Sequence, residues 1–190
     1  MSIRKFAAGG LALFVGLASS AAWAQAGEER IRRTGNFAGG AGVLTGADSS
    51  GARVCYFVEQ YQPGRAYIGV SQKTAFFLTE IPEQRDDAPP KPPLRIYAGK
   101  RQTGPDGKSE KYIASKSFAG EATYSVPNRE RANFNLVVTR DVEGFLSVVA
   151  AAKGDFLVID SADGSGRDYI SLLQFDASVA RTLLDCQRTL

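Results

Sequence analysis

The sequence predicts a mainly β domain, an antiparallel β-sandwich with two short helices near the C-terminus. Short runs of β-branched and aromatic residues recur along the chain, and Gly, Pro, Asn and Asp turn signals separate them about every ten residues, a spacing typical of sandwiches. The two stretches with helical periodicity both follow residue 140, so strands and helices do not alternate as a parallel βαβ sheet requires. We therefore expect roughly seven to nine strands in a single domain.

The strands are expected where short apolar runs lie between turn signals. Residues 52–59 (Ala-Arg-Val-Cys-Tyr-Phe-Val-Glu) are the clearest, because β-branched and aromatic side chains favour extended backbone. Residues 94–100 alternate apolar and polar side chains, the pattern of a half-buried strand. Residues 60–73 are polar and contain the turn signal Pro63-Gly64, so we interpret them as a connection. The other expected strands span residues 34–46, 74–81, 111–118, 121–127, 133–139, 155–160 and 167–173.

Both expected helices begin after an aspartate that can act as an N-cap. Asp141 precedes the first helix, which Lys153-Gly154 ends, and Asp176 precedes the second. Apolar residues at helical spacing define the inward face of each helix. These residues are Val142, Phe145, Leu146 and Val149 in the first helix, and Val179, Ala180, Leu183 and Leu184 in the second.

The N-terminus carries the three parts of a secretory signal peptide. Arg4 and Lys5 form a positive head, residues 6–18 are apolar, and small residues lead to two overlapping A-x-A sites. The apolar run contains glycines and is shorter than the roughly 20 residues of a membrane span, which argues against an anchor. We predict a signal peptide at 1–24 with cleavage after Ala24 or Ala26, a mobile leader at 25–33 and a single β-rich domain at 34–190.

Signal removal determines the expected location and charge of the mature protein. We expect a periplasmic or secreted protein without a transmembrane segment, because no later segment is apolar enough to cross a bilayer. Removing Arg4 and Lys5 from the 23 basic residues leaves 21 against 20 acidic ones, a net charge near +1. A nucleic-acid-binding domain would carry a strong basic excess, so no nucleic-acid partner is expected.

The chain has two cysteines, Cys55 in the clearest strand and Cys186 in the last expected helix. Disulfides form and persist in the oxidising space to which a signal peptide leads, and a redox-active pair would usually be C-x-x-C, which is absent. We predict a structural Cys55–Cys186 disulfide that joins the final helix to an early strand. The bridge would close a loop of 131 residues, for which the chain-entropy model gives roughly 5 kcal/mol as an upper figure.

No catalytic residue, metal ligand or cofactor site is predicted. The sequence contains no histidine, which removes the commonest general base and metal ligand, and oxidised cysteines provide no thiolate. Asp160, Asp163 and Asp168 surround a glycine turn but miss the spacing of an EF-hand calcium loop, so we interpret them as turn residues. Two carboxylates that meet in space would still permit a hydrolase acting on envelope glycans, which we keep as the alternative function.

Residues 82–93 contain five of the eight prolines, with five charged residues between them. This density favours an extended, polyproline-like surface segment. We expect it to bind a protein partner, since a preformed segment loses little entropy on binding, and we expect its deletion to leave the melting temperature nearly unchanged. The candidate partner-binding residues are Pro89, Pro90, Lys91, Pro92 and Pro93, with Tyr61 and Tyr67 as aromatic contacts.

A cluster of basic residues surrounds the strand that follows the proline-rich segment. Such a cluster can meet an acidic partner or anionic lipid headgroups. It also matches the solvent-exposed face of a strand, which is the interpretation that we favour. Its members are Lys91, Arg95, Lys100, Arg101 and Lys108.

Segments near both cysteines resemble a known family. Residues 51–58 (Gly-Ala-Arg-Val-Cys-Tyr-Phe-Val) and the strand at 76–79, then 154–158, 168–172 (Asp-Tyr-Ile-Ser-Leu) and a small amphipathic helix ending in Cys186, are similar to the invasion-associated locus B family of exported bacterial proteins. The resemblance covers about half of the mature chain and leaves out its middle. It implies a small secreted or periplasmic β-rich domain with no established enzymatic mechanism, in a family named for entry into host cells.

These observations predict a non-enzymatic binding or accessory protein of the bacterial periplasm or cell envelope. The missing histidine and the near-neutral mature charge favour this function over catalysis and over nucleic-acid binding. A protein partner is expected, and no cofactor.

Overall fold

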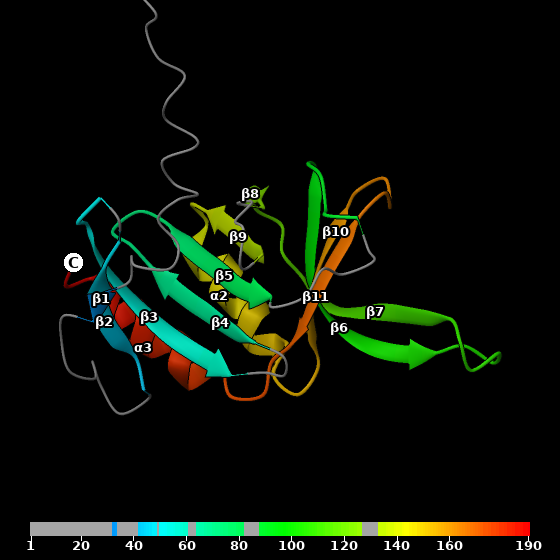
Figure 1. Cartoon of the computed structure of the whole chain (residues 1–190). Helices are drawn as coiled ribbons and strands as arrows, with labels where there is room; N and C mark the ends of the chain where they lie inside the picture. Colours follow the sequence, from blue (N-terminus) through cyan, green and yellow to red (C-terminus); the bar gives the residue numbers. More distant parts are fainter. Residues whose placement is uncertain (1–31, 34–41, 49, 61–63, 82–87, 127–132) are drawn as a thin grey trace, which may run out of the picture.

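The structure is a computed structural model that describes residues 32–33, 42–48, 50–60, 64–81, 88–126 and 133–190. The expected signal peptide at 1–24, the expected leader apart from its last two residues, and Tyr61 lie outside the described residues. The described chain forms two antiparallel sheets and two helices, which confirms the predicted mainly β fold with its helices near the C-terminus (Figure 1). Among these residues, no helix is long and apolar enough to span a membrane.

The larger sheet has seven strands in the order β1-β2-β3-β4-β5-β9-β8, and every neighbouring pair is antiparallel. Strands β3, β5 and β9 confirm the strands expected at 52–59, 74–81 and 133–139. The two residues of β1 belong to the segment expected to be a mobile leader, and they pair with β2. The strand bounds are β1 Arg32–Arg33, β2 Leu44–Ala47, β3 Arg53–Gln60, β4 Arg65–Val70, β5 Ala75–Ile81, β8 Ala122–Ser125 and β9 Asn133–Thr139.

The interpretation of residues 60–73 as a connection is wrong, because β4 lies within them and pairs with both β3 and β5. Ala66, Ile68 and Val70 alternate along β4 and are fully buried. The glycine that weakens the strand signal has a packing role. A Cβ added at Gly69 would collide with the Phe76 ring, so the strand needs glycine there to let that ring lie against its backbone.

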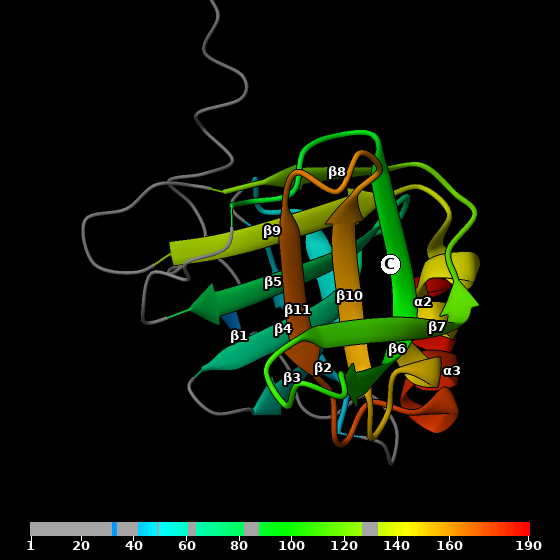
Figure 2. The same ribbon diagram turned by 90° about the vertical axis from the view of Figure 1, so that its right-hand side faces the viewer.

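The smaller sheet has four antiparallel strands in the order β11-β10-β6-β7. Its strands run steeply across those of the larger sheet, so the two sheets form separate layers (Figure 2). All four strands were expected from the sequence. Their bounds are β6 Leu94–Thr103, β7 Glu110–Ser117, β10 Phe156–Ser161 and β11 Arg167–Ser171.

The core lies between the larger sheet on one side and the smaller sheet with the two helices on the other. Alternate residues of both sheets point into it, as the period of two predicts. The larger sheet contributes side chains such as Phe57, Ile68 and Phe77, and the smaller sheet contributes Ile96 and Leu157. One continuous cluster of buried apolar residues joins them to the helices. This arrangement is the predicted antiparallel β-sandwich.

The two helices are α2 (Val142–Ala151) and α3 (Ala177–Gln187), and both caps are as predicted. An Asp141 carboxylate oxygen accepts a hydrogen bond from the Gly144 N–H at 3.1 Å. An Asp176 oxygen accepts hydrogen bonds from Ser178 and Val179 at 2.9 and 3.1 Å. Phe145, Leu146 and Val149 of α2 and Val179, Ala180 and Leu183 of α3 are buried, whereas Val142 and Leu184 are only half-buried.

The predicted disulfide between Cys55 and Cys186 is confirmed. It joins the middle of β3 to the last turn of α3, and the two Cα atoms lie 6.2 Å apart. Both cysteines are buried in the core. The bridge therefore ties the C-terminal helix to the larger sheet across a sequence separation of 131 residues.

Candidate functional site

The β6–β7 hairpin bends out of the smaller sheet and projects from the body of the molecule (Figure 1). The pairing of β6 with β7 shifts register between Ala98 and Gly99, which marks a β-bulge. A Cβ added at Gly99 would lie 3.0 Å from the Tyr97 ring and 3.3 Å from the Tyr112 Cβ, so glycine allows this close bend. In Figure 2, β7 passes in front of β10 and β11.

Three aromatic rings hold the base of this hairpin against the smaller sheet. The Tyr112 ring of β7 lies 5.3 Å from that of Phe156 in β10 and 5.0 Å from that of Tyr169 in β11, between ring centroids. Phe156 and Tyr169 are themselves 5.9 Å apart. Burial raises the pKa of Tyr112, and the neighbouring Tyr169 adds to this effect. The Tyr112 hydroxyl is buried without a well-aligned hydrogen bond to another described residue, and its polar contact is with Tyr169.

A charged cluster lies beside the aromatic rings. Arg167 of β11 donates two hydrogen bonds to the buried Asp160 of β10, from Nε to Oδ1 at 2.6 Å and from Nη2 to Oδ2 at 3.1 Å. The Tyr97 hydroxyl donates to Asp160 Oδ2 at 2.9 Å. The Arg167 Cζ atom also lies 5.5 Å from the centre of the Tyr112 ring, within the range of a cation–π contact. The guanidinium plane is therefore fixed by Asp160 and placed near an aromatic ring.

Two pKa values report this arrangement. Burial, followed by the hydrogen bond to Asp160, raises the pKa of Tyr97 to about 12. The hydrogen bonds to Asp160 raise the pKa of Arg167 above its usual value. Asp160, Arg167 and Tyr97 therefore form a connected polar group in which Asp160 accepts hydrogen bonds from both partners.

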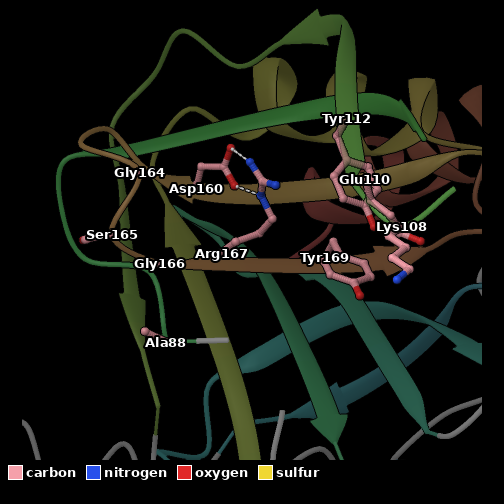
Figure 3. A pocket seen from close by; sticks show the side chains of 10 residues that line it. All are labelled: Ala88, Lys108, Glu110, Tyr112, Asp160, Gly164, Ser165, Gly166, Arg167 and Tyr169. Carbon is pink, nitrogen blue, oxygen red and sulfur yellow. Dashed lines mark hydrogen bonds and ion pairs between the residues drawn. The ribbon is translucent and has the colours of Figure 1, made fainter. Parts of the chain in front are cut away.

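The projecting hairpin and the β10–β11 hairpin enclose a cleft of about 480 Å³, which we call the hairpin cleft (Figure 3). Lys108, Glu110 and Tyr112 line it from the β6–β7 side. Arg167 and Tyr169 line it from the β10–β11 side, together with Asp160 and the turn at 164–166. Most of its lining is polar or charged, with Tyr112 and Tyr169 as the aromatic members, so it differs from the mostly apolar pockets that bind small molecules.

The proline-rich segment forms part of the wall of this cleft, through Ala88. Residues 82–87 lie outside the described residues, and the rest follows the β10–β11 hairpin. Arg167 N–H donates to the Ala88 carbonyl at 3.1 Å, Lys91 N–H donates to Ser161 Oγ at 2.8 Å, and Ala162 N–H donates to the Pro93 carbonyl at 2.8 Å. Of the five candidate residues in this segment, Pro90 is buried, and the exposed ones are Pro89, Lys91, Pro92 and Pro93.

The structure does not place the aromatic candidate Tyr67 with the proline segment. Tyr67 is half-buried in β4 of the larger sheet, where its ring lies 6.4 Å from that of Tyr56. Tyr61, the other aromatic candidate, is outside the described residues. Tyr67 therefore belongs to the larger sheet, whereas the described part of the proline segment lies beside the β10–β11 hairpin of the smaller sheet.

The predicted basic cluster is exposed throughout, and part of it faces partners within the fold. Arg101 Nη2 lies 2.9 Å from Glu110 Oε1 across the β6–β7 hairpin. Arg95 Nη2 donates to the Ser161 carbonyl at 3.5 Å. Lys108, in the turn of the hairpin, lines the cleft. The favoured interpretation as a solvent-exposed face fits Lys91 and Lys100, whereas Lys108 belongs to the cleft.

The three aspartates around the glycine turn separate in space. Asp163 is a turn residue as predicted, and its carboxylate accepts from the Ser165 N–H at 2.9 Å, which lowers its pKa. Asp160 faces the cleft, and Asp168 accepts a hydrogen bond from Asn135 Nδ2 at 2.7 Å between the two sheets. In the described part of the chain, no group of three or more acidic or cysteine side chains could hold a metal ion.

Tyr112, Arg167 and Tyr169 were not predicted as site residues from the sequence. Each of the two tyrosines follows a charged residue and precedes an isoleucine within an expected strand. An aromatic side chain on the outer face of a strand was therefore the signal in the sequence that could have indicated a site. The crossing of β7 in front of β11 could not be derived from local sequence, because it depends on a bulge and on long-range packing. Searches against protein-family models, characterised proteins and solved structures find no match to this chain.

Proposed function

We propose that this chain is a non-enzymatic, exported binding or accessory protein of the bacterial periplasm or cell envelope, and that the hairpin cleft holds a protein partner. The resemblance to the invasion-associated locus B family supports the compartment and the class of function. The buried Cys55–Cys186 disulfide also supports an oxidising compartment.

One observation carries this proposal: the cleft is open, and Arg167, Asp160 and Glu110, three of the charged groups that line it, are already held in pairs. Asp160 holds Arg167, and Arg101 holds Glu110, so binding requires no rearrangement of these groups. A partner that meets such a preformed surface loses less conformational entropy than one that must order it. The adjoining proline segment, held by three hydrogen bonds to the β10–β11 hairpin, extends the same fixed surface.

Site-specific photo-crosslinking in exporting bacteria tests this function. A photoreactive amino acid is placed at Ser165, which lines the cleft and is exposed, or at the exposed Arg181 of α3 as a matched control. We expect one protein adduct from the Ser165 position and none of the same mass from the Arg181 position. The captured protein should then bind the purified chain directly. No adduct at Ser165, or the same adduct from both positions, would contradict the proposal.

The alternative, an envelope-glycan hydrolase, is favoured by the fact that two carboxylates, those of Glu110 and Asp160, line the same cleft. However, Glu110 is paired with Arg101 and Asp160 with Arg167. Pairing with an arginine favours the ionised carboxylate, whereas a glycosidase needs one carboxyl group that carries a proton to donate. Incubation of purified peptidoglycan with the mature protein decides between the two functions. Turnover that is abolished by Glu110→Gln would replace the binding function with the hydrolase.

A further inference from the structure

We propose that the hairpin cleft binds a carboxylate of an acidic peptide segment, with Arg167 as its anchor and Lys108 as a second cationic contact. This inference rests on the proposed function, since it names the chemistry by which the cleft recognises a protein partner. Three features of the cleft support it: the donors that Arg167 has left, the balance of charge, and the way in which the aromatic rings are already covered.

Arg167 keeps an open set of hydrogen-bond donors. A guanidinium has five N–H groups in one plane, and Asp160 accepts one from Nε and one from Nη2. The remaining donors, two on Nη1 and one on Nη2, form a second fork of the kind that binds a carboxylate through two parallel hydrogen bonds. Figure 3 shows the third guanidinium nitrogen pointing away from Asp160. The Arg167 side chain is 39% exposed, so a ligand can reach this fork.

Asp160 and Tyr112 hold that fork in place before any ligand arrives. The Asp160 carboxylate is buried and is itself held by the Tyr97 hydroxyl, so it fixes one edge of the guanidinium. The Tyr112 ring lies 5.5 Å from the Arg167 Cζ atom and limits rotation of the plane. A preorganised arginine loses little side-chain entropy when it binds.

The charge balance of the cleft favours an anion. Asp160 compensates Arg167, and Arg101 compensates Glu110. Lys108 is exposed, and its ammonium has no ion pair with another described residue. The nearby Asp106 carboxylate is occupied by the backbone N–H groups of Lys108 and Ser109 and by the Ser109 hydroxyl. The Asp106 carboxylate keeps its charge but is turned toward these backbone and hydroxyl donors, so the Lys108 ammonium is, among the described residues, a cleft cation that can still pair with an anion.

The aromatic rings favour a peptide carboxylate over a sugar. A sugar ring stacks on an open aromatic face, and Arg167 lies over the ring of Tyr112, which is one of the two aromatic residues that line the cleft. A carboxylate side chain needs only the fork and the ammonium. The acidic group can come from a glutamate or aspartate side chain or from a C-terminus, and the two sources are separable by experiment.

The direct test is an NMR titration of the ¹⁵N-labelled mature protein with defined peptides. The probe is the N-acetylated, C-amidated peptide Gly-Ser-Gly-Glu-Glu-Gly-Ser-Gly. We expect it to shift the Arg167 Nε–H signal and the backbone N–H signals of the turn at 164–166, and we expect the same peptide with two glutamines to leave them unchanged. A glutamine peptide with a free C-terminus tests the terminal carboxylate as the source.

Equal shifts with glutamate and amidated glutamine peptides, or no shifts at Arg167, would overturn the assignment. The same NMR titration with inorganic phosphate tests whether the cleft binds phosphate in place of a peptide carboxylate. Shifts at Arg167 from phosphate, in the absence of shifts from the glutamate peptide, would show a phosphate site and would also overturn it.

Variants show whether these residues bind the peptide. Arg167→Gln combined with Asp160→Asn removes the fork without leaving a buried carboxylate unpaired, and we expect the affinity for the glutamate peptide to fall at least tenfold. Lys108→Glu leaves the Arg167–Asp160 pair untouched and should also cause a tenfold loss, so it tests the proposal even if the double variant fails to fold. Either variant binding as tightly as the parent protein would contradict the inference.

Lys73 offers a matched control for Lys108. It is exposed in the turn between β4 and β5, and its backbone N–H donates to Ser71 Oγ, much as that of Lys108 donates to Asp106 Oδ1. Lys73→Glu should leave peptide affinity unchanged, and a loss equal to that of Lys108→Glu would point to nonspecific charge attraction instead. If the crosslinked partner binds the cleft variants as tightly as the parent protein, the carboxylate assignment fails while the proposed function stands. If the Ser165 position gives no protein adduct in the parent protein, the proposed function itself fails.

Discussion

The buried carboxylate of Glu59 accepts a hydrogen bond from the Phe175 backbone N–H at 2.9 Å, across a sequence separation of 116 residues. The same carboxylate accepts from Leu173 and Gln174 at 3.0 and 2.9 Å. Three consecutive N–H groups thus converge on one side chain of β3, just before α3 begins. Together with the Cys55–Cys186 disulfide, this contact fixes both ends of the C-terminal helix to the same strand.

Glu59→Gln should destabilise the protein. Glutamine replaces one carboxylate oxygen with an NH₂ group, which is a donor. This NH₂ group would face backbone N–H donors that now point at a carboxylate oxygen. We expect the free energy of unfolding to fall by about 2 kcal/mol or more, since each hydrogen bond to a charged group contributes roughly 1.5–3 kcal/mol. Urea unfolding measures this change. Glu121→Gln, at an exposed glutamate, is the control and should change stability by less than about 0.5 kcal/mol.

Cys55→Ser combined with Cys186→Ser should lower the free energy of unfolding by roughly 2–5 kcal/mol, because the unfolded chain is then no longer closed by the bridge. Urea unfolding with and without a reducing agent measures the effect. The reductant should destabilise the parent protein by a similar amount and leave the double variant unchanged. Equal stability of the oxidised parent and the variant would show that the bridge contributes nothing.

Tyr97 predicts a loss of stability in alkali. Its pKa is raised to about 12, mainly by burial and then by the hydrogen bond to Asp160. A raised pKa means that the folded state favours the protonated phenol. The contribution of Tyr97 to the free energy of unfolding is therefore complete below the ordinary pKa of about 10, and it is lost as the pH rises toward 12. Urea unfolding between pH 9 and 11.5 should show a shallower decline for Tyr97→Phe than for the parent. Parallel declines would contradict this assignment.

Tyr112→Phe should keep or slightly raise stability. The Tyr112 hydroxyl is buried without a well-aligned hydrogen bond to a described residue, its polar contact being with Tyr169, and a poorly satisfied buried hydroxyl costs about 1–3 kcal/mol, whereas the ring contacts remain in phenylalanine. Thermal unfolding measures the difference. Tyr112→Ala is the matched comparison and should lose about 1–3 kcal/mol through the missing ring, less than a fully buried aromatic residue, because Tyr112 is half-buried. A loss in Tyr112→Phe comparable to that in Tyr112→Ala would show that the hydroxyl has a partner.

Gly166→Ala tests whether the proline segment is packed structure. An added Cβ at Gly166 would collide with the carbonyl oxygens of Pro89 and Ala88, so these two backbones must move apart. We expect a loss of about 1–3 kcal/mol in unfolding free energy, as for other overpacked sites. Ser165→Ala, at the exposed neighbouring position, should cost less than about 0.5 kcal/mol. A harmless Gly166→Ala would favour the expectation that deleting the segment leaves the melting temperature unchanged.

The sequence alone determined the features that depend on neighbours in the chain. The N-caps Asp141 and Asp176, the strand around Cys55 and the inward face of α3 all follow from spacing over a few residues. The disulfide could also be predicted, because two cysteines in an exported chain allow one intramolecular pairing. These signals are local or combinatorial, so they needed no knowledge of how the sheets pack.

The tertiary structure alone decided which polar groups meet. Glu59 was predicted as the end of a strand, yet it is buried against residues 173–175. Strand β4 was missed because its segment is polar and contains the turn signal Pro63-Gly64, yet it pairs with β3 and β5. Asp160, read as a turn residue, holds Arg167 in the hairpin cleft. Such pairings are determined by the register of strands and by the bulge at Gly99, and the free energy that selects them comes from contacts between segments far apart in the sequence.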